Sequence, residues 1–299
     1  MWTELSLDVT HEAIDWVKTL LATIDPQAQL RVSPCVEPDV AWAFTVRFYL
    51  PQSVRTQEIA ALLSPLHRTG LTSELQIATV EAVAEDNQLP LHRISDRFVV
   101  LSPNASYQAA ADEIVLKIGT GLAFGSGLHP ATIVSLRLLE RHVTPNLQAL
   151  DLGSGSGILS VAIAKLGGQV LALDNDTVAV EATQATVQQN QVESLVTVRQ
   201  GSLGQGSEMG HWMGGSIDPT PPFSPIATFD LIAANVLARI HIALAADYYR
   251  SLRSTGLLIT AGFTTDYADE METALATAGF VQVDREQSNE WIALAHRLA

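Results

Sequence analysis

Cysteine is almost missing from this chain, in which Cys35 is the single thiol among 299 residues. One cysteine excludes an intrachain disulfide, and proteins built without disulfides are typical of a reducing compartment. We therefore expect a cytoplasmic protein in which Cys35 is a buried structural thiol rather than a nucleophile.

Long apolar runs are missing as well. The most apolar stretch of suitable length, residues 229–246, is interrupted by polar side chains that include Asp230 and Arg239, so we expect no membrane span. The first residues, Met1–Glu4, lack the basic region followed by an apolar region that a secretory signal requires.

Positive charge is scarce, because 17 Lys and Arg stand against 32 Asp and Glu and give a formal net charge of −15. Proteins that follow nucleic-acid phosphates normally present a basic face, so we expect no direct nucleic-acid binding. Negative charge is densest in residues 1–88, which hold 5 basic and 12 acidic side chains. Two interpretations stay open: this acidic region attracts a basic partner, or it is an ordinary solvated surface.

The chain has enough apolar residues for a large core, since 47% are hydrophobic and only 16% are charged. Its 299 residues suggest two domains. Residues 1–88 follow the order strand, helix, strand, strand, helix, strand, which predicts a small ferredoxin-like α+β domain. These elements are expected at 5–9, 14–24, 29–33, 40–50, 53–68 and 74–83.

A connecting segment, residues 89–120, precedes residues 121–299, in which strands alternate with helices. This alternation predicts an α/β fold with an open, mostly parallel, Rossmann-like sheet and helices on both faces. The final extended runs, 280–286 and 290–298, are expected to pair as an antiparallel hairpin at the sheet edge. The other elements are expected at 97–101, 113–116, 148–151, 156–167, 169–174, 177–190, 196–200, 229–234, 238–253, 256–261 and 266–278.

Residues 204–225 have a different composition, with five Gly and four Pro among 22 positions. A segment of this kind builds no core. We interpret it as a flexible insertion, with a functional lid as the alternative.

A glycine-rich turn, Leu150–Ile158, runs from an expected strand directly into an expected helix. Glycine lets the backbone approach a ligand closely at the positive end of a helix. Asp174, at the end of the next strand, is placed to accept hydrogen bonds from both hydroxyls of a ribose. The G-x-G-x-G spacing, which includes Gly153 and Gly155, favours S-adenosylmethionine over a dinucleotide. Asp151 either meets the cofactor's ammonium group or braces the turn.

Two further segments carry candidate site residues. A strand ends at Asn235, whose amide either caps the following helix or orients an incoming amine toward a methyl donor. The segment Phe124–Thr132 is dense in Gly, Ser, His and Thr and could fold over the ligand. Within it, His129 is either a catalytic base or a residue that caps and braces the loop. We expect no metal site.

Several motifs occur in the order found in one known family: F-G-S-G-L-H-P-A-T, L-D-L-G-S-G-S-G-I-L-S, L-A-L-D-N-D followed by V-A-V-E-A-T, N-V-L-A and E-W-I-A-L-A-H-R-L. Together they closely resemble PrmA, the methyltransferase of the eleventh protein of the large ribosomal subunit. The resemblance covers residues 113–299, apart from the insertion, whereas over residues 1–112 it rests on position and strand order. Ser126, Ala131 and Ser154 depart from the residues common in that family.

The resemblance implies a class I, S-adenosylmethionine-dependent enzyme whose N-terminal domain recognises a ribosomal protein. It implies cofactor contacts at Thr132, Gly153, Asp174 and Asn235. We therefore predict methyl transfer to lysine ε-amines, and as a further option to an N-terminal amine, of a basic ribosomal protein. The alternatives are a methyltransferase for a nucleobase or small molecule and an inactive protein that binds the cofactor.

Overall fold

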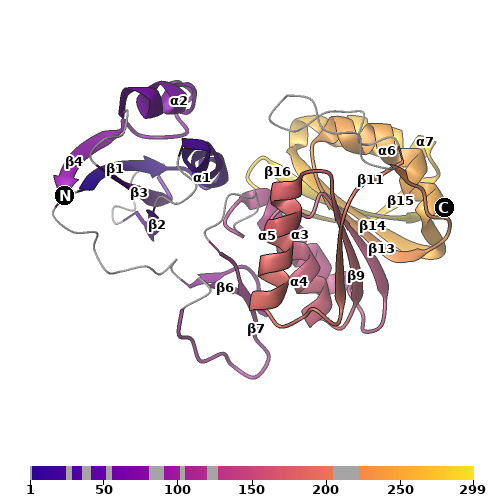
Figure 1. Ribbon diagram of the computed structural model, residues 1–299. Helices are drawn as coiled ribbons and strands as arrows, with labels where there is room; N and C mark the ends of the chain where they lie inside the picture. The colour runs from indigo at the N-terminus through magenta and orange to yellow at the C-terminus, as the bar shows by residue number, and fades with distance from the viewer. Residues whose placement is uncertain are drawn as a thin grey trace.

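The computed structural model describes residues 2–24, 29–35, 42–51, 56–80, 91–101, 105–119, 127–204 and 222–299 (Figure 1). The first elements are β1 (Trp2–Val9), α1 (Ala13–Ile24), β2 (Gln29–Pro34), β3 (Phe44–Pro51), α2 (Thr56–Arg68) and β4 (Gln76–Val80). Their strands pair antiparallel in the order β2-β3-β1-β4. This is the ferredoxin-like arrangement, so the fold predicted for this part of the chain is confirmed.

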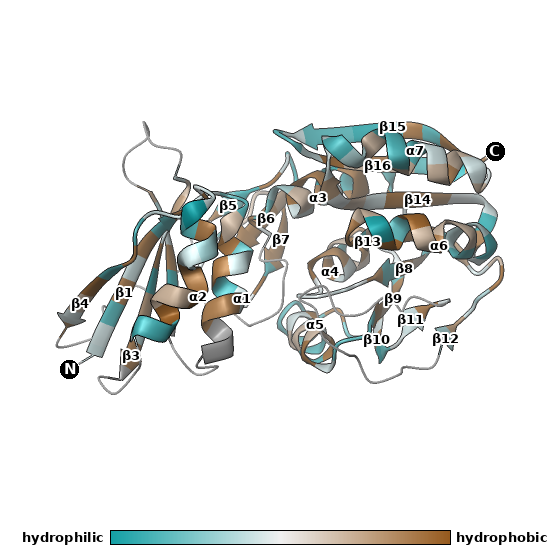
Figure 2. Ribbon diagram, turned by 90° about the horizontal axis from the view of Figure 1, so that it is seen from above, coloured by the Kyte–Doolittle hydropathy of each residue, from teal (hydrophilic) through white to brown (hydrophobic). Residues whose placement is uncertain are grey.

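The alternating pattern of β3 determines which face of this sheet is buried. Phe44, Val46, Phe48 and Leu50 are each at most 3% exposed. They pack with apolar side chains of α1 and α2, among which Ile14 is fully buried. Figure 2 shows the two helices side by side against the sheet.

Three short strands follow: β5 (His92–Arg93), β6 (Phe98–Leu101) and β7 (Ile114–Lys117). β6 and β7 are parallel neighbours, which confirms the two extended runs predicted here. Phe98 and Leu116 are fully buried in the same core as α3 and α4. The side chain of Asn190 fixes the end of β7, because it accepts from the N–H of Lys117 at 2.9 Å and donates to its carbonyl at 2.7 Å.

The central sheet has the order β10-β9-β8-β13-β14-β16-β15. Its strands are β8 (Gln148–Leu152), β9 (Gln169–Asp174), β10 (Val196–Gln200), β13 (Phe229–Asn235), β14 (Leu252–Thr264), β15 (Phe280–Ser288) and β16 (Trp291–Leu298). The first five strands in this order, β10, β9, β8, β13 and β14, pair in parallel. β16 pairs antiparallel with both β14 and β15. The predicted Rossmann-like sheet with an antiparallel edge hairpin is confirmed.

Helices cover both faces of this sheet (Figures 1 and 2). They are α3 (Pro130–His142), α4 (Ile158–Lys165), α5 (Thr177–Gln189), α6 (Ala238–Ser251) and α7 (Ala268–Thr277). Neighbouring strand residues point into different cores: Leu231 packs with side chains of α3 and α4, and Ile232 with those of α6 and α7. None of the helices in the described ranges is both long and apolar enough to cross a membrane.

Several boundaries differ from those predicted. α4 begins at Ile158 rather than at residue 156, because Gly157 has φ of +82°, which is not helical. α6 ends at Ser251 rather than at residue 253, and the strand expected from residue 256 begins at Leu252. Leu252 is extended and 3% exposed, and it pairs with Phe229, so burial extends β14 at the expense of the helix.

The ends of the Gly- and Pro-rich insertion are joined by a short parallel pair, β11 (Ser202–Leu203) and β12 (Pro222–Phe223). The N–H of Gly204 donates to the carbonyl of Phe223 at 2.9 Å. Residues 205–221, on which the prediction of a flexible insertion depends, lie outside the described residues.

Candidate functional site

The candidate site lies at the carboxyl ends of β8, β9 and β13. The chain runs outward from β8 to β9 and β10, then returns to β13 on the other side of β8. Ligands of open α/β sheets bind at such a reversal of strand order. Because Leu152 pairs with Ala234, the residues that follow, Gly153 and Asn235, flank this reversal on adjacent strands.

The glycine turn between β8 and α4 needs glycine for both conformation and space. Gly153, Gly155 and Gly157 have φ of +72°, +53° and +82°. A Cβ atom on Gly153 would lie only 2.6 Å from Cγ1 of Val236, the residue that follows β13. The N–H of Gly153 donates to the carbonyl of Leu173 at 2.8 Å, which ties the turn to β9. The turn is therefore held close to both neighbouring strands.

Asp174 is held by this turn. Its Oδ2 accepts a hydrogen bond from the N–H of Gly155 at 2.9 Å, and its Oδ1 accepts from the N–H of Asp176 at 3.1 Å. Burial raises the pKa of the carboxyl, and these backbone donors oppose the increase. The side chain is half-buried, so its position is fixed while each oxygen retains lone pairs for another donor.

Asp151 lies beneath the turn and is fully buried. Its Oδ2 accepts from the hydroxyl of Ser160 in α4 at 2.5 Å, which is the bracing contact considered above. Burial raises the pKa of Asp151 to about 7, against the lowering effect of the Ser160 bonds. Oδ1 has no hydrogen-bond partner among the described residues. This buried oxygen retains the capacity to accept a hydrogen bond.

Asn235 and Thr132 meet although they lie 103 positions apart in the sequence. The Nδ2 of Asn235 is 3.5 Å from the hydroxyl of Thr132, which lies in the first turn of α3 and is fully buried. Close packing on β14 fixes the turn after Asn235, because a Cβ atom on Gly262 would lie 2.5 Å from the carbonyl oxygen of Val236. The amide oxygen of Asn235 lies against the same glycine, because that Cβ atom would be 2.9 Å from Oδ1.

His129 caps α3. Its Nδ1 accepts a hydrogen bond from the N–H of Ala131 at 3.1 Å, and its ring contacts that of Trp291 at 4.5 Å between centroids. The side chain is 1% exposed, and burial lowers its pKa. Of the two roles considered, the structure supports capping and bracing. Phe124, the other candidate in this segment, lies outside the described residues.

Thr183, the last residue of the V-A-V-E-A-T motif, contacts the glycine turn, although the sequence alone assigned it no role. Its hydroxyl donates to the carbonyl of Gly155 at 3.0 Å and is 2.9 Å from the hydroxyl of Ser154. It is fully buried on α5. The packing of α5 against the turn gives Thr183 this place, and the close approach of β13 and β14 does the same for Val236 and Gly262.

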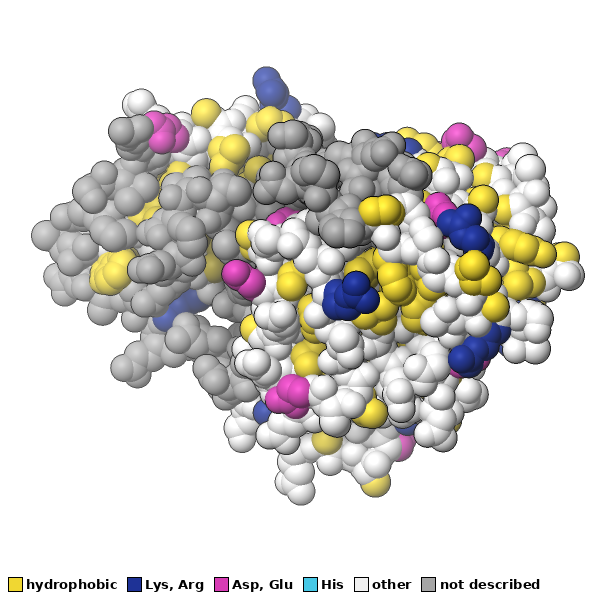
Figure 3. Space-filling model, turned by 45° about the vertical axis from the view of Figure 1, so that its right-hand side comes forward, with side chains coloured by type: hydrophobic (Ala, Val, Ile, Leu, Met, Phe, Trp, Pro, Cys, Tyr) yellow, Lys and Arg dark blue, Asp and Glu magenta, His cyan; other side chains and the backbone are white. Residues whose placement is uncertain are grey.

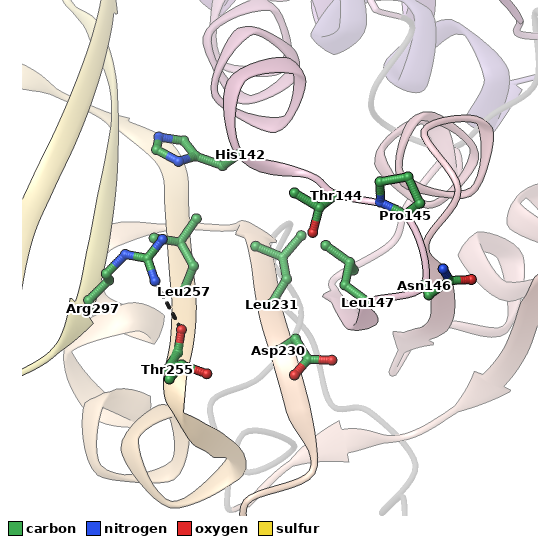
Figure 4. A pocket seen from close by; sticks show the side chains of 10 residues that line it. All are labelled: His142, Thr144, Pro145, Asn146, Leu147, Asp230, Leu231, Thr255, Leu257 and Arg297. Carbon is green, nitrogen blue, oxygen red and sulfur yellow. Dashed lines mark hydrogen bonds between the residues drawn. The ribbon is translucent and has the colours of Figure 1, made fainter.

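A separate cavity of about 450 Å³ lies at the opposite edge of the sheet (Figure 4). It is lined at the amino ends of β8, β13 and β14 by residues that include Leu147, Asp230 and Thr255. Arg297 borders it and donates to the carbonyl of Thr255 at 3.0 Å. This cavity contains none of the predicted site residues. Among the described residues, no three His, Cys, Asp or Glu side chains form a cluster that could hold a metal ion.

The sheet order, the glycine turn after β8, the acidic residue at the end of β9 and the Asn at the end of β13 together define a Rossmann-like methyltransferase of class I. The comparisons with known proteins agree. A family model described as ribosomal protein L11 methyltransferase (PrmA) matches residues 1–298. The chain belongs to this family.

Relatives and a solved structure support the assignment. A ribosomal protein L11 methyltransferase of Chloroflexus aurantiacus is 39% identical, with 99% of this chain and 98% of that protein covered. One from Herpetosiphon aurantiacus is 36% identical at the same coverage. The crystal structure of a ribosomal protein L11 methylase from Lactobacillus delbrueckii subsp. bulgaricus has a TM-score of 0.59 and 26% identity, over 70% of this chain and 98% of that one.

Proposed function

We propose that this enzyme binds S-adenosylmethionine at the carboxyl ends of β8, β9 and β13 and methylates lysine ε-amines of ribosomal protein L11. The observation that supports this most directly is the Asp174 carboxylate, which the N–H of Gly155 orients beside the glycine turn. In this position, one carboxylate can accept hydrogen bonds from both hydroxyls of a ribose.

The surrounding residues fit the cofactor. Gly153 has a positive φ and lies against Val236, so the turn that would hold the cofactor requires glycine at this position. The Oδ1 of Asp151 is an acceptor for the ammonium group of the cofactor's methionine moiety. Thr132 and Asn235 would border the cofactor from the side of β13. When bound, S-adenosylmethionine supplies an electrophilic methyl group on its sulfonium.

Asn235 is the residue that we assign to the acceptor amine. A lysine of ordinary pKa, ~10.4, is almost wholly protonated at neutral pH, so the site must favour the neutral amine. The contact of Nδ2 with Thr132 leaves the amide oxygen of Asn235 to accept a hydrogen bond from that amine. After loss of its proton to water, the amine would direct its lone pair at the methyl group, and the N–C bond would form in line as the S–C bond breaks and S-adenosylhomocysteine leaves.

The division of the chain follows from the same proposal. Residues 1–88 form the substrate-recognition domain, residues 89–120 form the connecting segment, and residues 121–299 form the methyltransferase catalytic domain. The acidic character of the first part favours a basic protein as partner, and we place the reaction in the cytoplasm. An N-terminal α-amine of the substrate is a further acceptor.

The test is mass spectrometry of purified ribosomal protein L11 after incubation with the enzyme and S-adenosylmethionine. We expect mass increases in methyl steps that map to lysines, and their loss with Asn235→Ala in an enzyme that still binds the cofactor. An unmodified substrate in the presence of folded, cofactor-bound enzyme would exclude the proposed acceptor.

A further inference from the structure

The segment Gly127–Thr132 lies between two hydrophobic cores. Leu128 is 2% exposed and belongs to the core of the N-terminal sheet, together with residues of β1, β3, α1 and α2. Gly127 faces the catalytic core instead, where a Cβ atom would lie 2.8 Å from Ile158 at the start of α4. Adjacent residues of one short segment are therefore held by different parts of the molecule.

Polar contacts reinforce this joint from the N-terminal side. The ring of His11, in the loop before α1, hydrogen-bonds to the backbone of Leu128 and packs edge-on against Phe44 at 4.9 Å. The neighbouring Glu12 faces Glu290, in the turn between β15 and β16, and burial together with this second carboxyl raises the pKa of Glu12. The loop before α1 thus contacts both the segment and the edge of the central sheet.

The segment leads directly to the candidate site. His129 caps α3 through the N–H of Ala131, and Thr132 in the first helical turn contacts the amide of Asn235. Figure 2 shows α3 between the short strands β5 to β7 and the edge strands of the central sheet. A displacement of Leu128 would therefore move the start of α3 and, with it, Thr132.

We propose that Leu128 and His11 are positioning residues through which the N-terminal part of the chain holds the cofactor-binding segment in place. The N-terminal part then contributes to the affinity for S-adenosylmethionine in addition to any role in recognising the substrate. This inference rests on the proposed cofactor site. Since coupling between sites is reciprocal, cofactor binding also stabilises the contact between α1 and the Gly127–Thr132 segment.

Calorimetry of S-adenosylmethionine binding to full-length variants tests this coupling. His11→Ala removes one hydrogen bond from outside the catalytic part, and we expect cofactor affinity to fall about threefold to tenfold. Leu128→Ala should lower the cofactor affinity at least as much. The conservative variant Leu128→Met should have an affinity close to that of the wild type. The matched control is Leu63→Ala on α2, which truncates a leucine of the same core at 3% exposure and should leave the affinity unchanged.

A double-mutant cycle separates coupling from two independent losses. We expect His11→Ala and Leu128→Ala to be clearly less than additive, because both release the same segment. Hydrogen exchange gives a second measurement: the cofactor should slow exchange of amides in residues 10–20 of the wild type but not of Leu128→Ala. This readout distinguishes coupling from local damage to the segment.

The outcomes distinguish the two proposals. If wild-type enzyme does not bind S-adenosylmethionine, or if Asp174→Ala binds it equally well, the cofactor site itself is wrong. If the wild type binds and folded His11→Ala and Leu128→Ala bind with unchanged affinity, the positioning role is wrong. An equal loss of affinity in Leu63→Ala would also overturn it, because the effect would then be general destabilisation of the N-terminal core.

Discussion

Two aspartates in the site have opposite surroundings. Asp174 is half-buried, and backbone N–H groups hold both of its oxygens. Asp151 is fully buried and has one oxygen bound by Ser160 and the other without a partner among the described residues. Asp174 is therefore suited to hydrogen-bond a neutral ligand group, and Asp151 to meet a positive one.

Asp174→Ala tests the ribose contact. Loss of a charge-assisted contact to two hydroxyls should weaken S-adenosylmethionine binding by on the order of 2–3 kcal/mol, or roughly 30- to 150-fold. Calorimetry measures the change, with Asp269→Ala on the exposed side of α7 as control. Equal affinities of the Asp174 variant and the wild type would refute the contact.

Asp151 should make the stability of the cofactor-free enzyme depend on pH. Its folded pKa of about 7 lies above the unfolded value of ~3.9, so the folded state binds more protons between these limits. The free energy of unfolding should therefore fall as pH rises from about 4 to about 7, by up to roughly 4 kcal/mol for this group. Asp151→Asn should flatten the decline in urea unfolding at pH 5 and pH 8. Parallel pH dependences in both proteins would show that another group is responsible.

At the level of elements, the turn from β8 into α4 depends on glycine for two separable reasons. Gly153 and Gly70 have nearly the same φ, +72° and +73°. A Cβ atom on Gly70 would meet nothing within 4 Å, whereas one on Gly153 would collide with Val236. The pair distinguishes backbone strain from steric conflict.

Gly70→Ala should cost about 1–2 kcal/mol of stability, the usual penalty for a left-handed residue with a side chain. Gly153→Ala should cost about 1–3 kcal/mol more through overpacking and should also weaken cofactor binding. Urea unfolding and calorimetry measure the two effects. If both variants lose the same stability and bind the cofactor equally, then Val236 does not constrain the turn.

The short pair β11 and β12 makes a second element-level prediction. Because Ser202 pairs with Pro222, the ends of the insertion are already neighbours. Replacing residues 205–221 by about eight Gly and Ser residues should leave folding and cofactor affinity nearly unchanged, since loop length alone changes stability little. A folded deletion variant that no longer binds S-adenosylmethionine would favour the alternative interpretation, that the insertion is a functional lid.

For the whole molecule, electrostatics bears on how the substrate is captured. The net charge is −15, and residues 1–88 hold 12 acidic against 5 basic side chains. On the face shown in Figure 3, Lys and Arg side chains lie apart from one another rather than in one patch. Attraction of a basic protein by such a surface acts over ~8–10 Å at ordinary salt.

Raising the salt concentration from 50 mM to 500 mM should therefore slow methylation of ribosomal protein L11, mainly through a lower association rate and a higher KM. Initial rates at several substrate concentrations separate KM from kcat. Affinity for S-adenosylmethionine, measured at the same salt concentrations, is the control and should change little. A methylation rate that salt leaves unaltered would favour the ordinary solvated surface.

The sequence by itself predicted most of the elements, the ferredoxin-like and Rossmann-like folds with their edge hairpin, and the candidate cofactor motifs. Secondary structure is encoded in local patterns. Three such patterns are the even-numbered apolar positions of β3, the alternation of strands and helices after residue 121, and the closely spaced final strands. The glycine turn and Asp174 are also visible locally, because each belongs to one strand end of a parallel sheet.

The tertiary structure alone decided which distant residues act together. Thr132 meets Asn235, Thr183 holds Gly155, and Leu128 enters the core of the N-terminal sheet. No periodicity indicates these contacts, since the partners come from separate elements. The raised pKa of Asp151 was equally hidden, because burial depends on how α4 packs over β8. Sequence pattern predicts most of the helices and strands, whereas packing decides what surrounds each polar group and hence its chemistry.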